Sequence, residues 1–414
     1  MKILTFLLIL IISIFSTSFS FSSDGDSINI YSHYKEKVIT DPSKGFKSYK
    51  NQTFFPSGNT PYRKAILKIT YQCPDGQNCG EWDYIDYIYL KKNNGYELNG
   101  EIINDTSRIE IARMISPYGS RFTPGWKFEW KTDITDFAFM LHDSTEIDLI
   151  HTGYESNTDR GWLVTIKFEL TEGTPAMETI GFEKLWEGVF PYGNSQDDIQ
   201  NYLKPVTIQN DNADFAELRV IQTGHGMDDF ENCAEFCSKW RQIYFDNDLI
   251  NQKQIWRECA DNPLYPQAGT WIFDRAGWCP GAIVEPDMYY FNLEDKSKHD
   301  LRIELEPYAN PNKPSANYVF SSYIFYYKKS DVKNDISLEE IISPSIEDMN
   351  SRKNPICKFP VIKVKNNSPE LIESFTAVYG SEGIVLDTFE YKGNLKAFES
   401  KEVVLPGTLK GKSG

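Results

Sequence analysis

The segment Leu163-Val-Thr-Ile-Lys-Phe-Glu-Leu170 alternates apolar side chains with polar ones. Successive side chains of a strand point to opposite faces, so this period of two predicts a strand with one buried and one wetted face. Further runs rich in β-branched and aromatic residues are typical of strands, and they lie at 65–71, 84–90, 216–221, 301–305 and 318–327. Between residues 27 and 173 no stretch sustains a helical period beyond about two turns. The sequence therefore predicts an all-β protein built of sandwiches or jelly rolls.

Breaks in this pattern divide the chain. The turn cluster Gly173-Thr174-Pro175 is the first candidate boundary after the N-terminal strands. The polar segment 331–358 is predicted to be a linker, in which Ser337-Leu-Glu-Glu340 has the pattern of a helix capping box. The predicted divisions are a signal peptide at 1–23, β domains at 27–175 and 181–330, the linker at 331–358 and a short β-rich appendage at 359–414.

The first residues have the pattern of a signal peptide. Lys2 precedes an apolar run over 3–15, and small residues follow over 16–20. The run is shorter than the roughly 18 to 20 residues that a membrane span needs, and no second stretch could span. We therefore expect a secreted protein, extracellular or periplasmic, with no membrane segment after the signal is removed.

The charge balance disfavours one class of partner. The chain has 43 Lys and Arg against 59 Asp and Glu, a net charge of −16. An acidic surface repels phosphate backbones, and no basic run with interleaved aromatic residues is present, so nucleic acid is not an expected partner.

Six of the seven cysteines form close neighbours in sequence: Cys73 and Cys79, Cys233 and Cys237, Cys259 and Cys279. An exported protein meets an oxidising compartment, which favours disulfides. Six cysteines allow about 15 pairings, so proximity alone leaves the pairing open. Zinc is an alternative for Cys-x-x-x-Cys, but only His225 lies close by as a further ligand. Cys357 is left over.

Two acids are flanked by these cysteines, Asp83 in Cys79-Gly-Glu-Trp-Asp83 and Glu235 in Cys233-Ala-Glu-Phe-Cys237. A loop closed by a disulfide can hold a carboxylate in a fixed position, and two carboxylates suffice to cleave a C–N or C–O bond with water. The alternative is a stapled surface loop whose acid is merely solvated.

Other catalytic patterns are missing from the sequence. It has no Gly-x-Ser-x-Gly elbow and no Gly-rich phosphate loop, and its five histidines form neither His-x-His nor His-Glu-x-x-His. A copper monooxygenase needs clustered histidines and a methionine, and only His225 and Met227 lie near one another. We therefore predict no metal and no cofactor.

At these motifs the chain resembles the peptide-N-glycosidase F family, bacterial amidases that remove N-linked glycans from glycoproteins. The resemblance runs over 27–330, about three quarters of the chain. Its order and spacing agree at Cys79–Asp83, Ile115-Ser-Pro-Tyr118, Cys233–Cys237, Cys259-Ala-Asp-Asn-Pro263 and Asp274-Arg-Ala-Gly-Trp-Cys-Pro-Gly281. The resemblance implies two side-by-side antiparallel jelly rolls with the active site in the cleft between them, and disulfides between the three neighbouring cysteine pairs.

The resemblance also implies roles. Asp83 would be the main catalytic carboxylate, working with a bound water, and Glu235 would contact the first N-acetylglucosamine and polarise the amide. Arg275 would line the site, unless it forms a structural ion pair with Asp274 or another acid. Further expected substrate contacts are Trp82, Tyr154, His225 and Trp278.

The chain departs from the family at three positions. A family glutamate falls on Thr152, and we predict that Glu155 takes its catalytic role. Tyr84 replaces an arginine and Thr223 a tryptophan, which suggests an altered glycan or peptide preference.

The expected function is hydrolysis of the bond between N-acetylglucosamine and the asparagine side chain, acting as a monomer on N-glycosylated proteins or glycopeptides. The alternative is a non-catalytic N-glycan-binding protein on the same scaffold. The tail 359–414 resembles a partial Ig-like accessory module of secreted bacterial enzymes.

Overall fold

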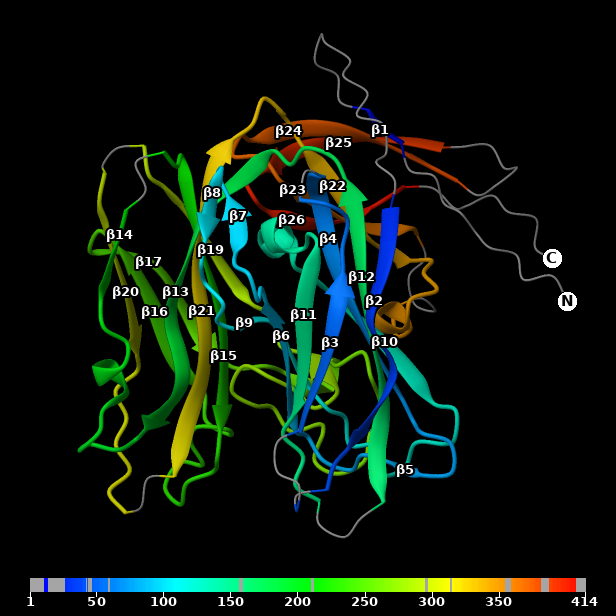
Figure 1. The fold of residues 1–414 in the computed structure, drawn as a ribbon, viewed down its shortest axis with the longest axis vertical. Coiled ribbons are helices and arrows are strands. Elements are labelled where there is room, and N and C mark those ends of the chain that lie inside the picture. Colours follow the sequence, from blue (N-terminus) through cyan, green and yellow to red (C-terminus); the bar gives the residue numbers. More distant parts are fainter. Residues whose placement is uncertain are drawn as a thin grey trace, which may run out of the picture. The chain divides into compact units, whose positions relative to one another are not determined.

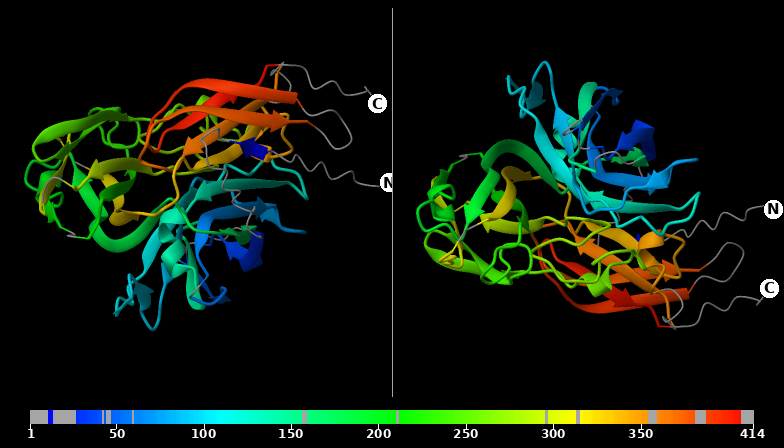
Figure 2. Two further views of the ribbon diagram at one scale, coloured as in Figure 1. Left: turned by 90° about the horizontal axis from the view of Figure 1, so that it is seen from above. Right: turned by 90° about the horizontal axis from the view of Figure 1, so that it is seen from below.

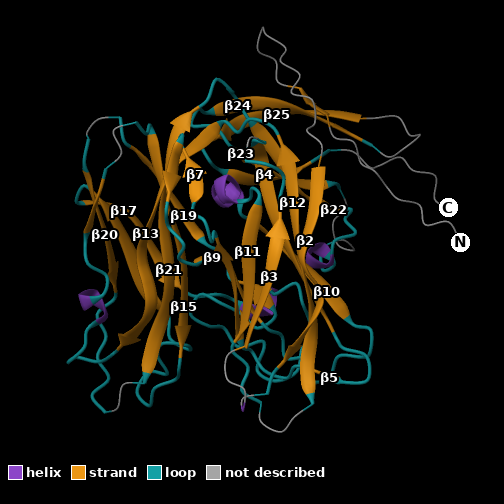
Figure 3. Ribbon diagram, in the orientation of Figure 1, coloured by secondary structure: helices purple, strands orange, loops and turns teal. Residues whose placement is uncertain are grey.

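The computed structural model describes residues 11–13, 27–41, 43, 47–58, 60–155, 159–209, 212–294, 297–312, 315–353, 359–380 and 387–406. Strands dominate these residues, and the helices among them are short 3-10 turns (Figure 1, Figure 3). The prediction of an all-β fold is confirmed. None of the helices in the described ranges is long and apolar enough to cross a membrane.

The chain forms two compact units. One comprises Asp26–Gly173 with Glu178–Lys328, and the other combines Met1–Gly25, Thr174–Met177 and Lys329–Gly414. The larger unit consists of two jelly rolls that lie side by side in all three views (Figure 1, Figure 2). Each jelly roll packs two antiparallel sheets against one another.

The first jelly roll contains the segment that predicted the fold class. One sheet has the order β10 (Lys127–Asp133), β4 (Tyr62–Gln72), β12 (Arg160–Glu172), β2 (Ser27–Ile39), with the two-residue β5 (Asn78–Cys79) beside β12. The other has the order β9 (Ile109–Ile115), β6 (Ile85–Lys91), β11 (Ser144–His151), β3 (Lys47–Phe54). Within β12, Val164, Ile166 and Phe168 are fully buried while the residues between them are half-buried, as the alternation predicts. A separate hairpin pairs β7 (Tyr96–Leu98) with β8 (Glu101–Ile103).

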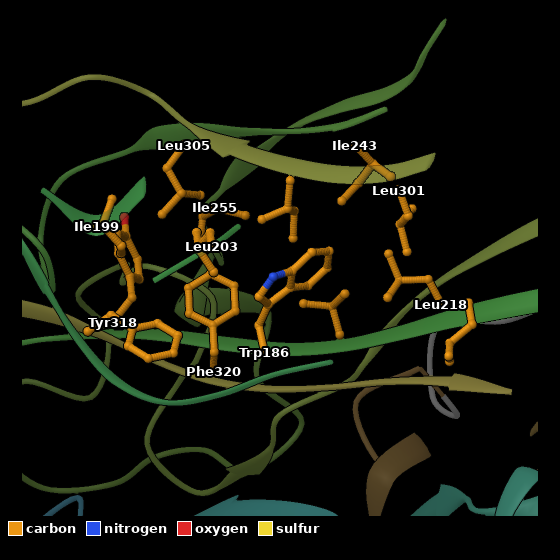
Figure 4. Packing of buried hydrophobic residues seen from close by; sticks show 14 of the residues in the cluster. Trp186, Ile199, Leu203, Leu218, Ile243, Ile255, Leu301, Leu305, Tyr318 and Phe320 are labelled. Atoms are coloured by element: carbon orange, nitrogen blue, oxygen red, sulfur yellow. The ribbon is translucent and has the colours of Figure 1, made fainter. Parts of the chain in front are cut away.

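The second jelly roll repeats this arrangement. Its sheets have the orders β13 (Met177–Tyr192), β21 (Ala316–Lys329), β15 (Phe215–His225), β19 (Asp287–Asn292), and β14 (Val206–Ile208), β20 (His299–Leu305), β16 (Lys239–Phe245), β17 (Asp248–Ile255). Trp186 packs among aliphatic side chains from both sheets, including Leu218, Ile243 and Leu301 (Figure 4). Full burial of each such aliphatic side chain contributes about 1.5–3 kcal/mol.

A loop of the second jelly roll completes a sheet of the first. Its strand β18 (Ala282–Ile283) pairs with Met114 and Ile115 of β9. Two further backbone bonds extend this pairing, from Gly281 N to Ile115 O at 3.0 Å and from Val284 N to Arg113 O at 2.8 Å. The loop that precedes β18 is thereby fixed on the first jelly roll.

The arginine of a buried ion pair also joins the two jelly rolls. Arg113 of β9 makes a bidentate contact with Glu110, with Nε–Oε1 2.8 Å and Nη2–Oε2 2.9 Å. Its Nη1 donates to Thr223 Oγ1 at 2.7 Å and to the Val319 carbonyl at 3.0 Å, both in the second jelly roll. The side chains of the pair are 0% and 2% exposed, so this contact is shielded from water.

The smaller unit contains two further sheets around one core. They have the orders β22 (Ile336–Ser343), β23 (Val361–Asn366), β26 (Ser400–Val404), and β1 (Ile11–Ser13), β24 (Ile372–Tyr379), β25 (Asp387–Leu395). Val364, Phe375 and Ala377 lie in the shared core. Of the predicted signal peptide, only the backbone of β1 is described, and it pairs with β24.

The predicted helical signal at Ser337–Glu340 is wrong. These residues lie in β22, which pairs with β23 with a register shift between Leu338 and Glu340. The Ser337 hydroxyl donates to the Glu339 carboxylate at 2.8 Å instead of capping a helix. Part of the predicted linker therefore belongs to a sheet, because strand pairing outweighs a local capping pattern. Cys357 lies outside the described residues.

The Arg113→Ala variant should lose about 3–5 kcal/mol of unfolding free energy, because Glu110 would remain as an unpaired buried charge. Denaturant unfolding followed by tryptophan fluorescence measures this loss. The control is Lys50→Ala, which removes an ion pair with Glu146 whose lysine is 55% exposed and should cost at most about 1 kcal/mol. Equal losses in the two variants would contradict a special role for the buried pair.

Candidate active site

Asp83 lies in the short loop between β5 and β6. The Cys73–Cys79 disulfide, with a Cα–Cα distance of 4.9 Å, closes the turn before it. Gly80 N donates to the Gly161 carbonyl at 3.1 Å, and a Cβ at Gly80 would lie 2.2 Å from Nε1 of the buried Trp162. After Asp83, Tyr84 N donates to the Ser116 hydroxyl at 2.9 Å, and this hydroxyl donates to the Trp82 carbonyl at 2.7 Å. The backbone on both sides of Asp83 is therefore fixed.

The Asp83 carboxylate faces two donors. Tyr118 donates its hydroxyl to Asp83 Oδ2 at 2.9 Å, and Arg275 Nη2 lies 3.6 Å from the same oxygen. Burial raises the pKa of Asp83, and the Arg275 charge and the Tyr118 hydrogen bond oppose that rise. The side chain is 17% exposed, so water can still reach it.

Glu235 comes from the second jelly roll. The Cys233–Cys237 disulfide closes a five-residue loop around it, and its backbone bonds to Gly226 and Ala276. Its Oε1 lies 3.3 Å from Arg275 Nε. Burial and the Asp83 charge together raise the pKa of Glu235 to about 7, although Arg275 opposes both effects. A carboxyl of this kind changes charge near neutral pH, as acid–base groups at active sites commonly do.

Arg275 links the two acids. Its side chain is 1% exposed, and its Nη1 donates to the carbonyls of Thr270 and Phe273. The guanidinium also lies over the rings of Phe236, at 5.1 Å, and Trp278, at 4.9 Å. The alternative was a structural ion pair with Asp274 or another acid, and the acids that Arg275 contacts are Asp83 and Glu235.

Asp274 has a different partner, since its carboxylate accepts from Cys259 N at 2.9 Å. The Cys259–Cys279 disulfide closes the loop that carries Arg275. All three disulfides are those that the resemblance implies, and they remove these cysteines from any zinc site. Within the described ranges, no group of three or more His, Cys, Asp or Glu side chains could hold a metal ion.

Exposed aromatic rings border the acids. Trp82 is 50% exposed and lies edge-on to Tyr118, with ring centroids 6.0 Å apart. Tyr154 is 70% exposed and packs on Tyr84 at 4.8 Å. Burial raises the pKa of the Tyr154 hydroxyl, with further contributions from the charges of Asp83 and Glu235, so this ring lies near both acids. Such rings can pack against the apolar face of a sugar.

Two predicted substrate contacts lie behind this surface. Trp278 is 2% exposed beneath Arg275, so it supports the guanidinium, and its contact with substrate stays a prediction. His225 stacks on Trp278 at 5.2 Å, and its Nε2 lies 2.8 Å from Thr223 Oγ1. Burial and the nearby Arg113 charge lower the pKa of His225 to about 3, so its ring is neutral.

Glu155, the predicted third catalytic acid, lies in a neighbouring group of contacts. Its Oε1 lies 3.8 Å from Arg160 Nε, and its carboxylate accepts from Thr40 and from the backbone of Glu81. The sequence predicts no role for Tyr118 or Thr270, although Tyr118 lies in the motif Ile115-Ser-Pro-Tyr118. Thr270 Oγ1 lies 3.3 Å from the Tyr118 hydroxyl and 3.2 Å from Arg275 Nη2.

Comparison with known proteins finds similar sequences. The family model described as peptide-N-glycosidase F, C terminal, matches residues 194–325. The peptide-N(4)-(N-acetyl-beta-D-glucosaminyl)asparagine amidase F of Elizabethkingia miricola is 29% identical over a 265-residue alignment that covers 60% of this chain and 69% of that one.

Solved structures share the fold. That of PNGase F, a glycosylasparaginase from Flavobacterium meningosepticum, matches with a TM-score of 0.62 at 24% identity, covering 74% of this chain and 97% of that one. A crystal structure of the peptide-N(4)-(N-acetyl-beta-D-glucosaminyl)asparagine amidase at 2.2 Å resolution matches with a TM-score of 0.61 at 25% identity and covers 98% of that chain.

The fold is thus that of the peptide-N-glycosidase F structures, with two jelly rolls. The chain is similar to the peptide-N-glycosidase F family, and the fold implied by the sequence resemblance is confirmed.

Replacing Glu235 by Gln should stabilise the protein at pH 8 by roughly 3 kcal/mol at most. Above pH 7 the native glutamate is ionised in a site that favours its neutral form, which opposes folding. Below its usual pKa of 4.5 the acid is protonated in both the folded and the unfolded state, so the two proteins should converge. Denaturant unfolding of both proteins from pH 4 to 8 tests this, and a difference independent of pH would contradict it.

Proposed function

We propose that this protein is a secreted amidase that hydrolyses the bond between N-acetylglucosamine and the asparagine side chain of N-glycosylated proteins or glycopeptides. The observation that carries the proposal is the buried Arg275 guanidinium, which contacts Asp83 of one jelly roll and Glu235 of the other. The amidase named in the comparisons supports the substrate class.

In the proposed reaction, Asp83 holds and deprotonates a water that attacks the amide carbonyl of the glycosylated asparagine. The Tyr118 hydroxyl and Arg275 keep the accepting oxygen in place. Glu235, neutral below about pH 7, donates a hydrogen bond that polarises the amide. The C–N bond then breaks as the proton taken up by Asp83 passes to the departing nitrogen, so asparagine becomes aspartate and the glycan leaves as a glycosylamine that loses ammonia in water.

The exposed rings of Trp82 and Tyr154 would receive the sugar nearest the scissile bond. Three disulfides suit an oxidising compartment and support export through the signal peptide at 1–23. In this proposal the active site belongs to the β domains at 27–175 and 181–330, the appendage takes no part in the chemistry, and the protein acts as a monomer.

The alternative of a non-catalytic glycan-binding protein is motivated by Thr152, which stands where the family has a glutamate. Both functions use the same surface. Turnover separates them, because a binding protein would retain a glycopeptide unchanged.

The purified protein should deglycosylate a denatured N-glycoprotein, and Asp83→Asn should lower kcat by at least about 100-fold because it removes the general base. Mass spectrometry of the peptide, which detects aspartate in place of glycosylated asparagine, measures the reaction. Asp75→Asn, at an exposed acid in the loop closed by the Cys73–Cys79 disulfide, should retain full activity.

Two results would overturn the proposal. Binding of glycopeptide by the wild type without product would favour the glycan-binding alternative. Full activity of Asp83→Asn would remove this residue from the mechanism.

A further inference from the structure

Arg160, the first residue of β12, contacts two loops at once. Its Nη2 lies 2.9 Å from Glu81 Oε2, and its Nη1 donates to the Cys79 carbonyl at 3.2 Å. Its Nε lies 3.8 Å from Glu155 Oε1. Glu81 and Cys79 belong to the loop of Asp83, whereas Glu155 follows β11, so one guanidinium joins both loops.

Glu155 makes the second connection between them. Its carboxylate accepts from the Glu81 backbone N–H and from the Thr40 hydroxyl, and its own N–H donates to the Thr40 carbonyl at 2.6 Å. Thr40 N in turn donates to the Arg160 carbonyl at 3.3 Å. The Glu155 side chain is 4% exposed, so these bonds are little screened by water.

The residues joined by these contacts are sequence neighbours of the candidate site residues. Glu81 immediately precedes Trp82 and Asp83, and Glu155 immediately follows Tyr154. A bond to the backbone of Glu81 therefore acts two residues from the catalytic carboxylate. The same group of contacts fixes the base of both exposed rings that border the acids.

We propose that Glu155 and Arg160 are positioning residues, which hold the Trp82–Asp83 and Tyr154 loops in register for the reaction. This inference rests on the proposed amidase function for its kinetic consequence. It changes the role of Glu155, which then acts through the Asp83 loop without touching substrate.

A surface ion pair would contribute little, since exposed pairs are worth only about 0–1 kcal/mol. The Arg160 side chain is 20% exposed, but its bonds to a backbone carbonyl and to a buried acid distinguish it from such a pair. Displacing a catalytic group by about 1 Å can cost on the order of 100-fold in rate.

The test compares Glu155→Gln with Glu155→Ala. The amide oxygen of Gln can still accept from Glu81 N–H and Thr40, so this variant should keep kcat within about 3-fold and retain the wild-type pH profile. Ala cannot accept, so kcat should fall by on the order of 10- to 100-fold. The kcat of Arg160→Met should fall likewise. The effects of Arg160→Met and Glu155→Ala on kcat should be non-additive in the double variant, since the two residues share partners. Lys37→Met, at an exposed cation on the neighbouring strand β2, is the matched control.

A second measurement does not depend on activity. Hydrogen exchange of a peptide spanning residues 79–84 should accelerate in Glu155→Ala and Arg160→Met but remain unchanged in Glu155→Gln and in the control. Circular dichroism confirms that each variant is folded. If the wild type proves inactive, the proposed function fails, while faster exchange would still support the positioning contacts.

Two outcomes overturn the inference. Loss of activity in Glu155→Gln as complete as in Asp83→Asn would make Glu155 a catalytic acid. Unchanged exchange and unchanged kcat in both Glu155→Ala and Arg160→Met would remove the positioning role.

Discussion

The site depends on one buried cation shared by two acids. Arg275 faces Asp83 and Glu235, so when both are ionised the group carries a net negative charge in a largely buried site. Burial raises the pKa of each carboxyl, which shows that the guanidinium offsets only part of the desolvation. The arrangement persists because the surrounding fold holds all three side chains. The raised pKa values of the two acids are therefore maintained at the expense of local stability.

The two acids come from different jelly rolls, so their separation is set by how those jelly rolls are joined. Strand β9 is buried along its whole length, and β18 extends its sheet from the opposite jelly roll. The Arg113–Glu110 pair adds a contact of defined geometry at the same place. Rigid attachment between domains is what lets loops on each supply parts of one site.

Local patterns predicted part of this structure. The alternation in 163–170 predicted a strand, and the flanking cysteines marked Asp83 and Glu235 as candidate site residues. Each of these signals is contained within a few neighbouring residues. The pairing of Tyr118 with Asp83 and of Arg160 with Glu81 joins residues 35 and 79 positions apart, and no local pattern encodes it. At 337–340 a local signal was present but misleading, because pairing with β23 decided the conformation.

The glycine of Cys79-Gly-Glu-Trp-Asp83 is required by packing and not by chemistry. Trp162 Nε1 lies where any side chain at Gly80 would begin, and Trp162 Cη2 lies 2.4 Å from the corresponding position of Gly119. The indole ring of Trp162 thus leaves no room for a side chain at Gly80 or Gly119, and this restriction does not involve substrate. A search that recognises proteins by this motif consequently selects for a packed tryptophan as well as for chemistry. A relative could keep the glycine and the fold after its catalytic aspartate had changed.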